Sequence, residues 1–376
     1  MEKKGRVVVG MSGGVDSTVA AYLLRESGWE VIGVTLRLWS GCEARAEAHR
    51  RPCCSLSDLR EAGLWARRLG LEHLAVDVRR EFVQCVVNPF VREYVRGRTP
   101  NPCVECNRRL KFPQLLRAAE RLGATRVATG HYARVEERAG AYRLMRGKDR
   151  AKDQSYVLWR LGQEWLSRLL LPLGGLLKSE VCRMAGEMGL ETAERQESQD
   201  ICFLPGRDYR EFIEETEPGA FRPGLIVDTE GRVLGRHRGI AGFTVGQRRG
   251  LGIAAHRPLY VIDLDPDRDL VVVGGREEAE MRRVEAEEAG WVAGTPPVPC
   301  GGSFPATVKV RYQMEAVPGT VTLSGRDSFA VELEEPVPAA APGQSAVLYR
   351  GEELLGGGII VRGKGADLPR VDHVSR

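Results

Sequence analysis

The sequence of 376 residues lacks long hydrophobic runs, and none approaches the ~18 apolar residues that a membrane-spanning helix needs. The longest apolar stretch, residues 169–177, is interrupted by Pro172, Gly174 and Gly175. The N-terminal apolar run is brief and leads straight into a glycine turn, which is typical of a first strand and not of a signal peptide. We therefore expect a cytoplasmic protein that has no membrane partner.

Lysine is also scarce, because only 8 of the 55 basic residues are Lys and the others are Arg. Arg presents a planar fork that grips phosphate and stacks on bases, although genome composition or thermal adaptation also raises the Arg content of whole proteins. The distribution is more informative than the total. Residues 231–262 hold six Arg and two His without one Asp or Glu, and residues 92–111 hold six basic against two acidic residues. Such runs favour a polyanionic partner.

The sequence has nine cysteines, an odd number. In a chain without a secretion signal this argues against a disulfide scaffold and favours reactive thiols or metal ligands for a subset. Cys103 and Cys106 form a CxxC pair, which supplies two ligands of a zinc site, but no second pair has that spacing. A structural zinc clip is therefore the less favoured interpretation.

The first half of the chain alternates strand and helix patterns, which predicts an α/β fold with a parallel sheet and helices on both faces. The expected strands are residues 7–10, 31–36, 74–78 and 125–129. The expected helices are residues 16–27, 57–69, 80–96 with a kink at Pro89, 111–122 and 178–189.

After about residue 205 the helical periodicity fades, and short strands with frequent Gly and Pro predict small β-rich domains, the last one barrel-like. The expected strands are residues 225–228, 259–264, 270–274, 306–310, 319–323, 330–333 and 345–349. An acidic stretch at residues 277–288 separates two β-rich groups. We therefore expect three domains, a catalytic domain at 1–205, a small central domain at 206–280 and a C-terminal β-rich domain at 281–376.

The strongest local motif is the string SGGVDS, from Ser12 to Ser17, which follows a predicted strand and opens a predicted helix. Its glycines allow close backbone approach to a ligand, and a helix N-terminus offers free N–H groups to an anion. Asp16 suits a bare phosphate poorly unless it helps to hold Mg²⁺ or orders the loop. The GxxxxGK[ST] pattern is missing, which excludes a P-loop NTPase.

Two further motifs contain cysteines. TPNPCVECN, from Thr99 to Asn107, is stiffened by two prolines, and we expect Cys106 to lie just before a helix near Arg108 and Arg109, where a thiolate is favoured. Cys202 ends the string ESQDIC, whose polar leader predicts a loop and not a buried position.

These motifs together resemble the bacterial-type tRNA-specific 2-thiouridylase family, a member of the PP-loop ATP pyrophosphatase superfamily whose signature is SGGxDS. The resemblance covers essentially the full length. It is carried, in chain order, by GMSGGVDS, CCS at residues 53–55, TPNPCVECN with LKF, ATGHYAR, KDQSYVL, ESQDICF and GFTVGQRRGLGI.

The resemblance implies an enzyme that uses ATP and Mg²⁺ to adenylate the C2 oxygen of the wobble uridine and then installs sulfur. The implied catalytic residues are Cys106 and Cys202, the latter carrying persulfide sulfur. The implied ATP-binding residues are Gly10, Met11, Ser12, Gly13, Gly14, Val15, Asp16, Ser17, Leu36 and Gly130. The implied tRNA or active-site residues are Asn101, Pro102, Cys103, His131, Lys152, Asp153, Gln154, Arg311, Tyr312 and Gln344.

Two positions depart from the family pattern, since Leu36 stands where Met is frequent and Cys103 where many members have Asp. The implied partners are the anticodon arm of tRNA and a persulfide donor such as a cysteine desulfurase or a sulfur-relay protein. We also expect the segments that hold Cys106 and Cys202 to close when tRNA binds, because both read as polar loops, and a Cys106–Cys202 disulfide as the by-product.

Three alternatives remain open from the sequence. A PP-loop amidotransferase or ligase would act on a small metabolite and would need neither basic surfaces nor paired cysteines. An RNA-binding protein with a relict nucleotide site would bind tRNA without consuming ATP. Finally, Cys103, Cys106 and Cys202 offer enough thiolates to hold an iron–sulfur cluster.

Overall fold

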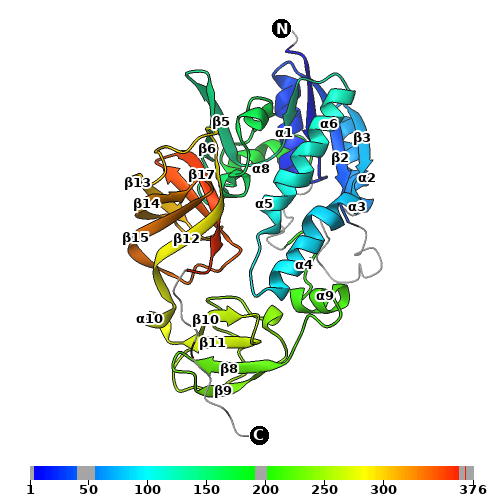
Figure 1. The fold of residues 1–376 in the computed structure, drawn as a ribbon. Coiled ribbons are helices and arrows are strands. Elements are labelled where there is room, and N and C mark those ends of the chain that lie inside the picture. The colour runs from blue at the N-terminus through cyan, green and yellow to red at the C-terminus, as the bar shows by residue number, and fades with distance from the viewer. Residues whose placement is uncertain (1–3, 40–55, 191–200, 364–368, 370–376) are drawn as a thin grey trace.

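The computed structural model describes residues 4–39, 56–190, 201–363 and 369. Figure 1 shows an α/β part, a β-barrel beside it, and a small third sheet that lies below both in this view. In the part of the chain that the structure describes, no helix is long and apolar enough to cross a membrane.

The first sheet is parallel throughout, as the sequence predicts, with strand order β3-β2-β1-β4-β7. Its strands are β1 Arg6–Gly10, β2 Glu30–Arg37, β3 Glu72–Asp77, β4 Arg126–Ala128 and β7 Leu169–Leu170. The strand that leads into the glycine loop, β1, lies in the middle, so the loop emerges at the carboxyl edge of the sheet between two neighbours. This is the edge at which open α/β sheets bind ligands.

Helices cover both faces of this sheet, because side chains alternate along a strand. Val7 and Val9 pack with α1 (Val15–Glu26) and α2 (Leu56–Arg68) in one apolar cluster. Val8 lies in the cluster on the other face, with apolar side chains of α6 (Phe112–Arg121). The predicted doubly covered sheet is thereby confirmed.

Two helical runs each contain a π-helical segment just before a proline. The predicted helix 80–96 consists of α3 (Arg79–Phe82), the π-helical η2 (Val83–Val87) and α4 (Asn88–Val95), which has Pro89 in its first turn. The second run is α5 (Pro102–Cys106), the π-helical η3 (Asn107–Lys111) and α6, which has Pro113 in its first turn. Proline supplies no N–H to the preceding turn, and the wider π-turn accommodates that loss.

A hairpin that the sequence pattern did not reveal follows β4. Its strands, β5 (Ala133–Arg138) and β6 (Ala141–Arg146), pair with each other, and β6 pairs with the last strand of the barrel. The α/β part then continues through η4 (Ser155–Leu158) and α7 (Gln163–Leu166), and it ends with α8 (Lys178–Glu187).

The central part begins with α9 (Tyr209–Thr216) and forms a four-stranded sheet in the order β10-β11-β8-β9. Its elements are β8 Gly224–Asp228, β9 Val233–His237, η6 Ile240–Gly242, β10 Tyr260–Asp265 and β11 Leu270–Gly274. Only the β11–β8 pairing is parallel. Ile226, Val261 and Val273 anchor its own apolar cluster.

The last part is a closed antiparallel barrel in the order β12-β15-β14-β13-β16-β17, with β17 also paired to β12. Its strands are β12 Glu280–Trp291, β13 Ser303–Lys309, β14 Val317–Gly325, β15 Ser328–Pro338, β16 Ser345–Arg350 and β17 Glu353–Val361. The acidic stretch 277–288 follows the last strand of the central sheet and begins the barrel. It forms α10 (Arg276–Ala279) and most of β12.

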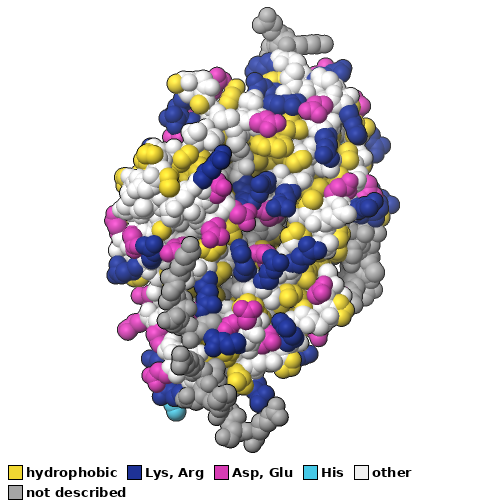
Figure 2. Space-filling model, viewed as in Figure 1, with side chains coloured by type: hydrophobic (Ala, Val, Ile, Leu, Met, Phe, Trp, Pro, Cys, Tyr) yellow, Lys and Arg dark blue, Asp and Glu magenta, His cyan; other side chains and the backbone are white. Residues whose placement is uncertain are grey.

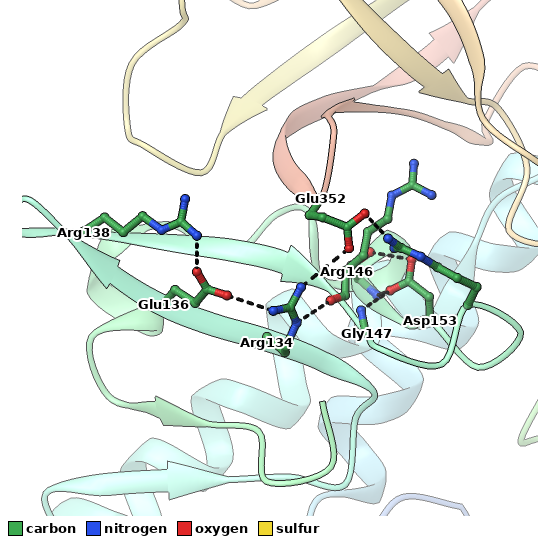
Figure 3. Close-up of polar contacts among 9 residues, drawn as sticks. Arg134, Glu136, Arg138, Arg146, Gly147, Asp153 and Glu352 are labelled. Carbon is green, nitrogen blue, oxygen red and sulfur yellow. Dashed lines mark hydrogen bonds and ion pairs between the residues drawn. The ribbon is translucent and has the colours of Figure 1, made fainter. Parts of the chain in front are cut away.

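The hairpin and the barrel are joined by a ladder and by ion pairs (Figure 3). Arg134 of β5 lies 3.0 Å from Glu136 of the same strand and, across the junction, 3.6 Å from Glu352, the residue before β17. Because these side chains are about one-third exposed or more, each pair contributes little stability. The fully buried Leu144 and Leu354, which face each other in the β6–β17 register, provide the apolar part of the junction.

Candidate active site

The glycine loop opens α1 as the sequence predicts. Gly13 has φ +78°, and a Cβ there would lie 2.5 Å from the Asp58 carbonyl oxygen, so only glycine fits. Gly14 is the N-cap of α1 and has no side chain to occupy the N–H groups of the first turn. These N–H groups and the positive end of the helix dipole are available to a phosphate.

Hydroxyl groups fix the shape of this loop. The backbone N–H of Ser12 donates to Ser17 Oγ at 3.1 Å, and Ser17 Oγ donates to the Gly14 carbonyl at 3.0 Å. Thr18 Oγ1 donates to the same carbonyl at 3.0 Å. The loop is therefore preorganised before any ligand arrives, with Val15 half-buried beside it.

Asp16 orders the loop through two partners. Lys178 Nζ, at the start of α8, donates to both carboxylate oxygens at 2.7 and 2.9 Å, and the Tyr132 hydroxyl donates to Oδ1 at 2.8 Å. Sequence reasoning missed Lys178, which places a cation at the phosphate-binding end of α1. The one available signal was its identity, because a Lys is unusual in this Arg-rich chain.

Gly130 joins the loop to the neighbouring strand end. A Cβ on it would lie 2.9 Å from the Asp16 carbonyl carbon and 3.0 Å from the Ser17 nitrogen, so the chain after β4 packs directly on the loop backbone. His131 follows, with Nδ1 2.7 Å from Thr129 Oγ1 and its ring stacked on Phe112. Burial, assisted by the charge of Lys111, lowers the pKa of His131 to about 3, so the ring is neutral.

Apolar side chains line the remaining predicted ATP-binding positions. Met11 and Leu36 are buried, and the Met11 carbonyl accepts from Thr35 Oγ1 at 2.8 Å. A Cβ on Gly10 would lie 3.1 Å from Leu115 of α6, so this glycine allows the helix to approach the strand end. The structure thus places every predicted ATP-binding residue on the carboxyl ends of β1, β2 and β4, on the loops that follow, or in the first turn of α1.

Cys106 is not the exposed, activated thiol that the sequence predicts. It lies inside the continuous helical run of α5, η3 and α6 and not just before a helix, and it is 6% exposed. Burial raises the pKa of Cys106 to about 11, Lys111 opposes that increase, and the nearby thiols of Cys103 and Cys85 add to it. The expectation of a thiolate was wrong because burial outweighs the effect of the neighbouring positive charge on the thiol.

The segment before Cys106 begins α5 with a regular cap. Asn101 is the N-cap, and its Oδ1 accepts from the Cys103 N–H at 3.1 Å, while Pro102 occupies the first turn. Cys103 is exposed and Pro102 is buried. The predicted loop is therefore a short helix that presents Cys103 to solvent and turns Cys106 inward.

Cys202 is half-buried and borders the same apolar cluster that contains Cys106. The next residue, Phe203, is 2% exposed and packs edge-on against Phe82 and Phe90 at 5.6 and 5.3 Å between ring centroids. This anchor holds Cys202 beside the helical run of α3, η2 and α4. Glu197, Ser198, Gln199 and Asp200 lie outside the described residues.

Among the described residues, no three or more His, Cys, Asp or Glu side chains gather at a spacing that could hold a metal ion. Cys103, Cys106 and Cys202 all belong to the described residues. The three thiols are therefore not assembled as cluster ligands in this fold, as the iron–sulfur alternative would require.

Family models match nearly the whole chain. A tRNA methyl transferase HUP domain matches residues 5–206, a tRNA methyl transferase PRC-barrel domain matches 210–275, and an aminomethyltransferase β-barrel domain matches 281–360. The tRNA-specific 2-thiouridylase MnmA of Geobacter metallireducens is 46% identical over 94% of this chain and 96% of that protein. The MnmA of Heliobacterium modesticaldum is 46% identical over 98% of this chain and 96% of that protein.

The chain belongs to the tRNA-specific 2-thiouridylase MnmA family. A solved 4-thiouridine synthetase–RNA complex with bound ATP is similar over 57% of this chain and 51% of that chain, with 21% identity and a TM-score of 0.35.

Two of the three KDQ residues of this MnmA family member are used inside the fold. Asp153 is 5% exposed and accepts from the backbone N–H groups of Gly147 (Figure 3) and Ser155 at 3.1 and 3.0 Å. Gln154 Oε1 accepts from the Tyr132 N–H at 2.9 Å, next to the Asp16 site. Lys152 is half-buried. The Asp153 carboxylate is therefore engaged inside the fold, and its contact with tRNA stays a prediction.

The predicted barrel residues lie near the α/β part. Arg311 donates to the Ala339 carbonyl, while Tyr312 is 36% exposed and lies 5.8 Å from the Tyr156 ring. Lys309 Nζ sits over the rings of Tyr156 and Tyr312 at 5.9 and 5.6 Å. Tyr312 thus offers an exposed ring beside a cation, which suits stacking on a nucleobase.

Basic side chains gather across the middle of one face, between the barrel and the helices α4 and α5 (Figure 2). A cavity of about 610 Å³ lies there, lined by residues of both parts that include Arg108, Arg160 and Glu288. Arg160 is only 6% exposed and lies 3.0 Å from Glu105 of α5 and 2.8 Å from Glu288 of β12. This bridge holds the helix that carries Cys106 against the barrel.

Proposed function

We propose that this chain is an ATP-dependent tRNA-uridine 2-sulfurtransferase that thiolates C2 of the wobble uridine, at position 34 of tRNA. The observation that carries the proposal is that one cation, Lys111, lies near both of its half-sites. Gly130 packs on the Asp16–Ser17 backbone, His131 follows it, and the charge of Lys111 acts on both His131 and Cys106. A phosphate-binding helix end and a cysteine site are therefore neighbours in a chain 46% identical to MnmA proteins.

In this proposal ATP binds at the N-terminus of α1 with its phosphates on the loop from Ser12 to Ser17. Lys178 neutralises phosphate charge, since it already lies beside this helix end. Mg²⁺ would fit here once Lys178 turns from Asp16 to the phosphates, because one carboxylate together with the phosphates of a nucleotide is a usual magnesium environment. Met11, Leu36 and Gly130 would border the nucleoside. Mg²⁺ would supply further charge neutralisation on the phosphates.

The uridine must leave its stack, because its C2 oxygen is otherwise inaccessible. That oxygen attacks the α-phosphorus of ATP, a new O–P bond forms, and the bond to the β-phosphate oxygen breaks to release pyrophosphate. The adenylate turns a poor leaving group into a good one. The exposed start of α5, with Asn101, Pro102 and Cys103, is the surface that we assign to the base. Neutral His131 can donate or accept a hydrogen bond nearby, but at neutral pH it adds no charge.

Sulfur transfer then uses the two cysteines. The terminal sulfur of a Cys202 persulfide attacks C2, and AMP leaves with the former C2 oxygen. The Cys106 thiolate attacks the inner Cys202 sulfur, the S–S bond breaks, and the terminal sulfur stays on C2 as the thiocarbonyl. A Cys106–Cys202 disulfide remains, which a reductant must reopen. Alternatively, Cys106 attacks the persulfide first and releases hydrosulfide, which then attacks C2.

The buried state of Cys106 sets a condition on this scheme. With its pKa near 11, very little thiolate exists at neutral pH, so the thiol must lose a proton or gain charge stabilisation when tRNA and ATP bind. Lys111 is the side chain placed to stabilise the thiolate. The buried helix, and not a polar loop, is therefore what has to rearrange.

The anticodon arm would lie across the basic face, with Lys152, Arg311 and Tyr312 at its edge, and affinity should fall steeply with salt because most contacts are to phosphate. The sulfur comes from a protein persulfide donor, such as a cysteine desulfurase or a relay protein.

The test is nucleoside mass spectrometry on a wobble-uridine tRNA incubated with the protein, ATP, Mg²⁺ and a persulfide source. The proposal requires 2-thiouridine with the wild type and none with Cys202→Ser or Cys106→Ser. AMP release that depends on a small metabolite in place of tRNA would favour a ligase. Tight tRNA binding without ATP consumption would favour an RNA-binding protein.

A further inference from the structure

We propose that Gln344 is a positioning residue that holds Thr99, and through Thr99 the start of α5, so that the barrel and the central sheet together set the position of Cys103 and Cys106. The structural part of this inference stands on the contacts alone, and only its effect on rate rests on the proposed function.

On the barrel side, the loop before β16 forms hydrogen bonds with both the N–H and the carbonyl group of Thr99. The Thr99 N–H donates to the Pro342 carbonyl at 2.7 Å, and Gln344 Nε2 donates to the Thr99 carbonyl at 2.8 Å. Gly343 lies between these two partners with φ +92°, and a Cβ on it would lie 3.0 Å from three backbone atoms of Thr99. The barrel loop and Thr99 are thus in direct backbone contact.

The same loop is tied into the barrel wall. The Gly343 N–H donates to the Ile360 carbonyl at 2.9 Å, and the Ile360 N–H donates to the Gln344 carbonyl at 2.8 Å. Ile360 belongs to β17, the strand that closes the barrel on β12. The position of Thr99 therefore depends on the closed barrel, because the loop that contacts Thr99 is hydrogen-bonded to a barrel strand.

On the central side, the Thr99 hydroxyl donates to Thr244 Oγ1 at 3.2 Å. Thr244 begins a tight turn, because its N–H donates to Gln247 Oε1 and its carbonyl accepts from the Gln247 N–H at 3.1 and 2.9 Å. The next contact leads back to the barrel, since a Cβ on Gly246 would lie 2.6 Å from Arg311 Nη2. The motif GFTVGQRRGLGI therefore lies where all three parts of the chain meet.

From Thr99 the path to the cysteines is short and stiff. Pro100 follows directly, Asn101 caps α5 through the Cys103 N–H, and Pro102 starts the helix. Two prolines and a capped turn leave few backbone dihedral angles that can rotate freely between Thr99 and Cys103. A displacement of Thr99 therefore moves the start of α5 as a unit.

This geometry gives Gln344 a role besides direct contact with tRNA, because one of its two amide N–H groups already holds the Thr99 carbonyl. It also suggests how tRNA binding affects the position of the two cysteines of α5. RNA bound on the barrel and on the Arg-rich central segment acts on the two elements that hold Thr99, so binding energy can be used to place the cysteine helix.

The first experiment is hydrogen exchange on the RNA-free protein, which needs no assumption about the reaction. Gln344→Met keeps the length of the side chain, removes its N–H and adds no charge. We expect peptides that span residues 99–107 to exchange about three- to tenfold faster, the range for loss of one net hydrogen bond. Peptides from β14 and from β1 should be unchanged. Unchanged exchange at 99–107 would overturn the proposal.

The second experiment separates positioning from RNA contact. For Gln344→Met we expect the single-turnover thiolation rate at saturating tRNA to fall at least threefold while the Kd for tRNA stays within twofold. A Kd raised tenfold with an unchanged saturated rate would show that Gln344 acts as an RNA contact. If the wild type makes no 2-thiouridine, the proposed function fails, but the exchange result still decides the structural claim.

A matched pair tests the central-side bond. Thr99→Val removes the hydroxyl and Thr99→Ser retains it, so accelerated exchange at residues 99–107 should appear with Val and be largely restored with Ser. Equal exchange in both variants would contradict a role for the Thr99–Thr244 contact.

Discussion

Substituting Gly130 by Ala tests whether the chain after β4 shapes the glycine loop. The added Cβ would lie 2.9 Å from the Asp16 carbonyl carbon and 3.0 Å from both the Asp16 oxygen and the Ser17 nitrogen. These are backbone atoms, so no flexible side chain can move aside. Overpacking of this kind costs roughly 1–3 kcal/mol.

Because the atoms that must move are those of the first turn of α1, we expect the cost to appear in ATP binding. If the whole free-energy cost is paid only in the ATP-bound state, Gly130→Ala raises the Kd for ATP about 5- to 150-fold. Calorimetric titration with ATP measures this, and thermal unfolding without ATP shows how much of the cost falls on the fold itself.

Gly186→Ala is the matched control, because it makes the same chemical change within α8, where a Cβ meets nothing within 4 Å. Alanine favours a helix interior over glycine by ~1 kcal/mol, so this variant should melt slightly higher with an unchanged Kd for ATP. An unchanged ATP Kd in Gly130→Ala would refute the assignment of this loop to ATP or the contact that we describe.

Three further predictions concern other parts of the site. Below pH 6.5 His131 binds a proton in the unfolded chain, but in the folded chain it stays neutral because its pKa is near 3. The stability of the wild type should therefore fall by about 2 kcal/mol between pH 6.5 and 5. A His131→Gln variant should lose less stability over this range, as measured by urea unfolding. Iodoacetamide at pH 8 should modify Cys103 well before Cys106, which peptide mass spectrometry resolves; the reverse order would contradict the buried thiol. Arg160→Met should lower the free energy of unfolding by about 1–3 kcal/mol, because Glu105 loses the cation that pairs with it. Glu288→Gln should lower it by under ~1 kcal/mol, because Glu288 is exposed.

The parallel sheet could be predicted because its signals are local. Val7, Val8 and Val9 form an uninterrupted apolar run, which is typical of a strand buried on both faces, and the SGGVDS string marks the strand-to-helix turn. The hairpin β5–β6 could not be predicted, because its mixed charged and apolar residues make sense only beside β17, some 200 residues later. The strand β12 within the acidic stretch could not be predicted for a similar reason, since charged residues such as Glu287 alternate along its outer face.

At the site, the sequence could supply residue types but not burial. Cys106 lies beside basic residues in the sequence, yet its thiol points into the apolar cluster, and burial outweighs the effect of Lys111 on its pKa. Lys178 and Gln344 reach their partners across 162 and 245 residues, separations that no local pattern encodes. The assignment of individual residues to ATP and tRNA stays a prediction until binding is measured.

The central claim is that ATP bound at the glycine loop activates the same uridine that the cysteines thiolate. The most direct measurement uses tRNA whose wobble uridine carries oxygen-18 at C2, followed by mass spectrometry of the released nucleotide and of the nucleoside. We predict AMP that contains the label in its phosphate, in a one-to-one ratio with 2-thiouridine. Unlabelled AMP, ADP in place of AMP, or thiouridine formed without ATP would contradict the account.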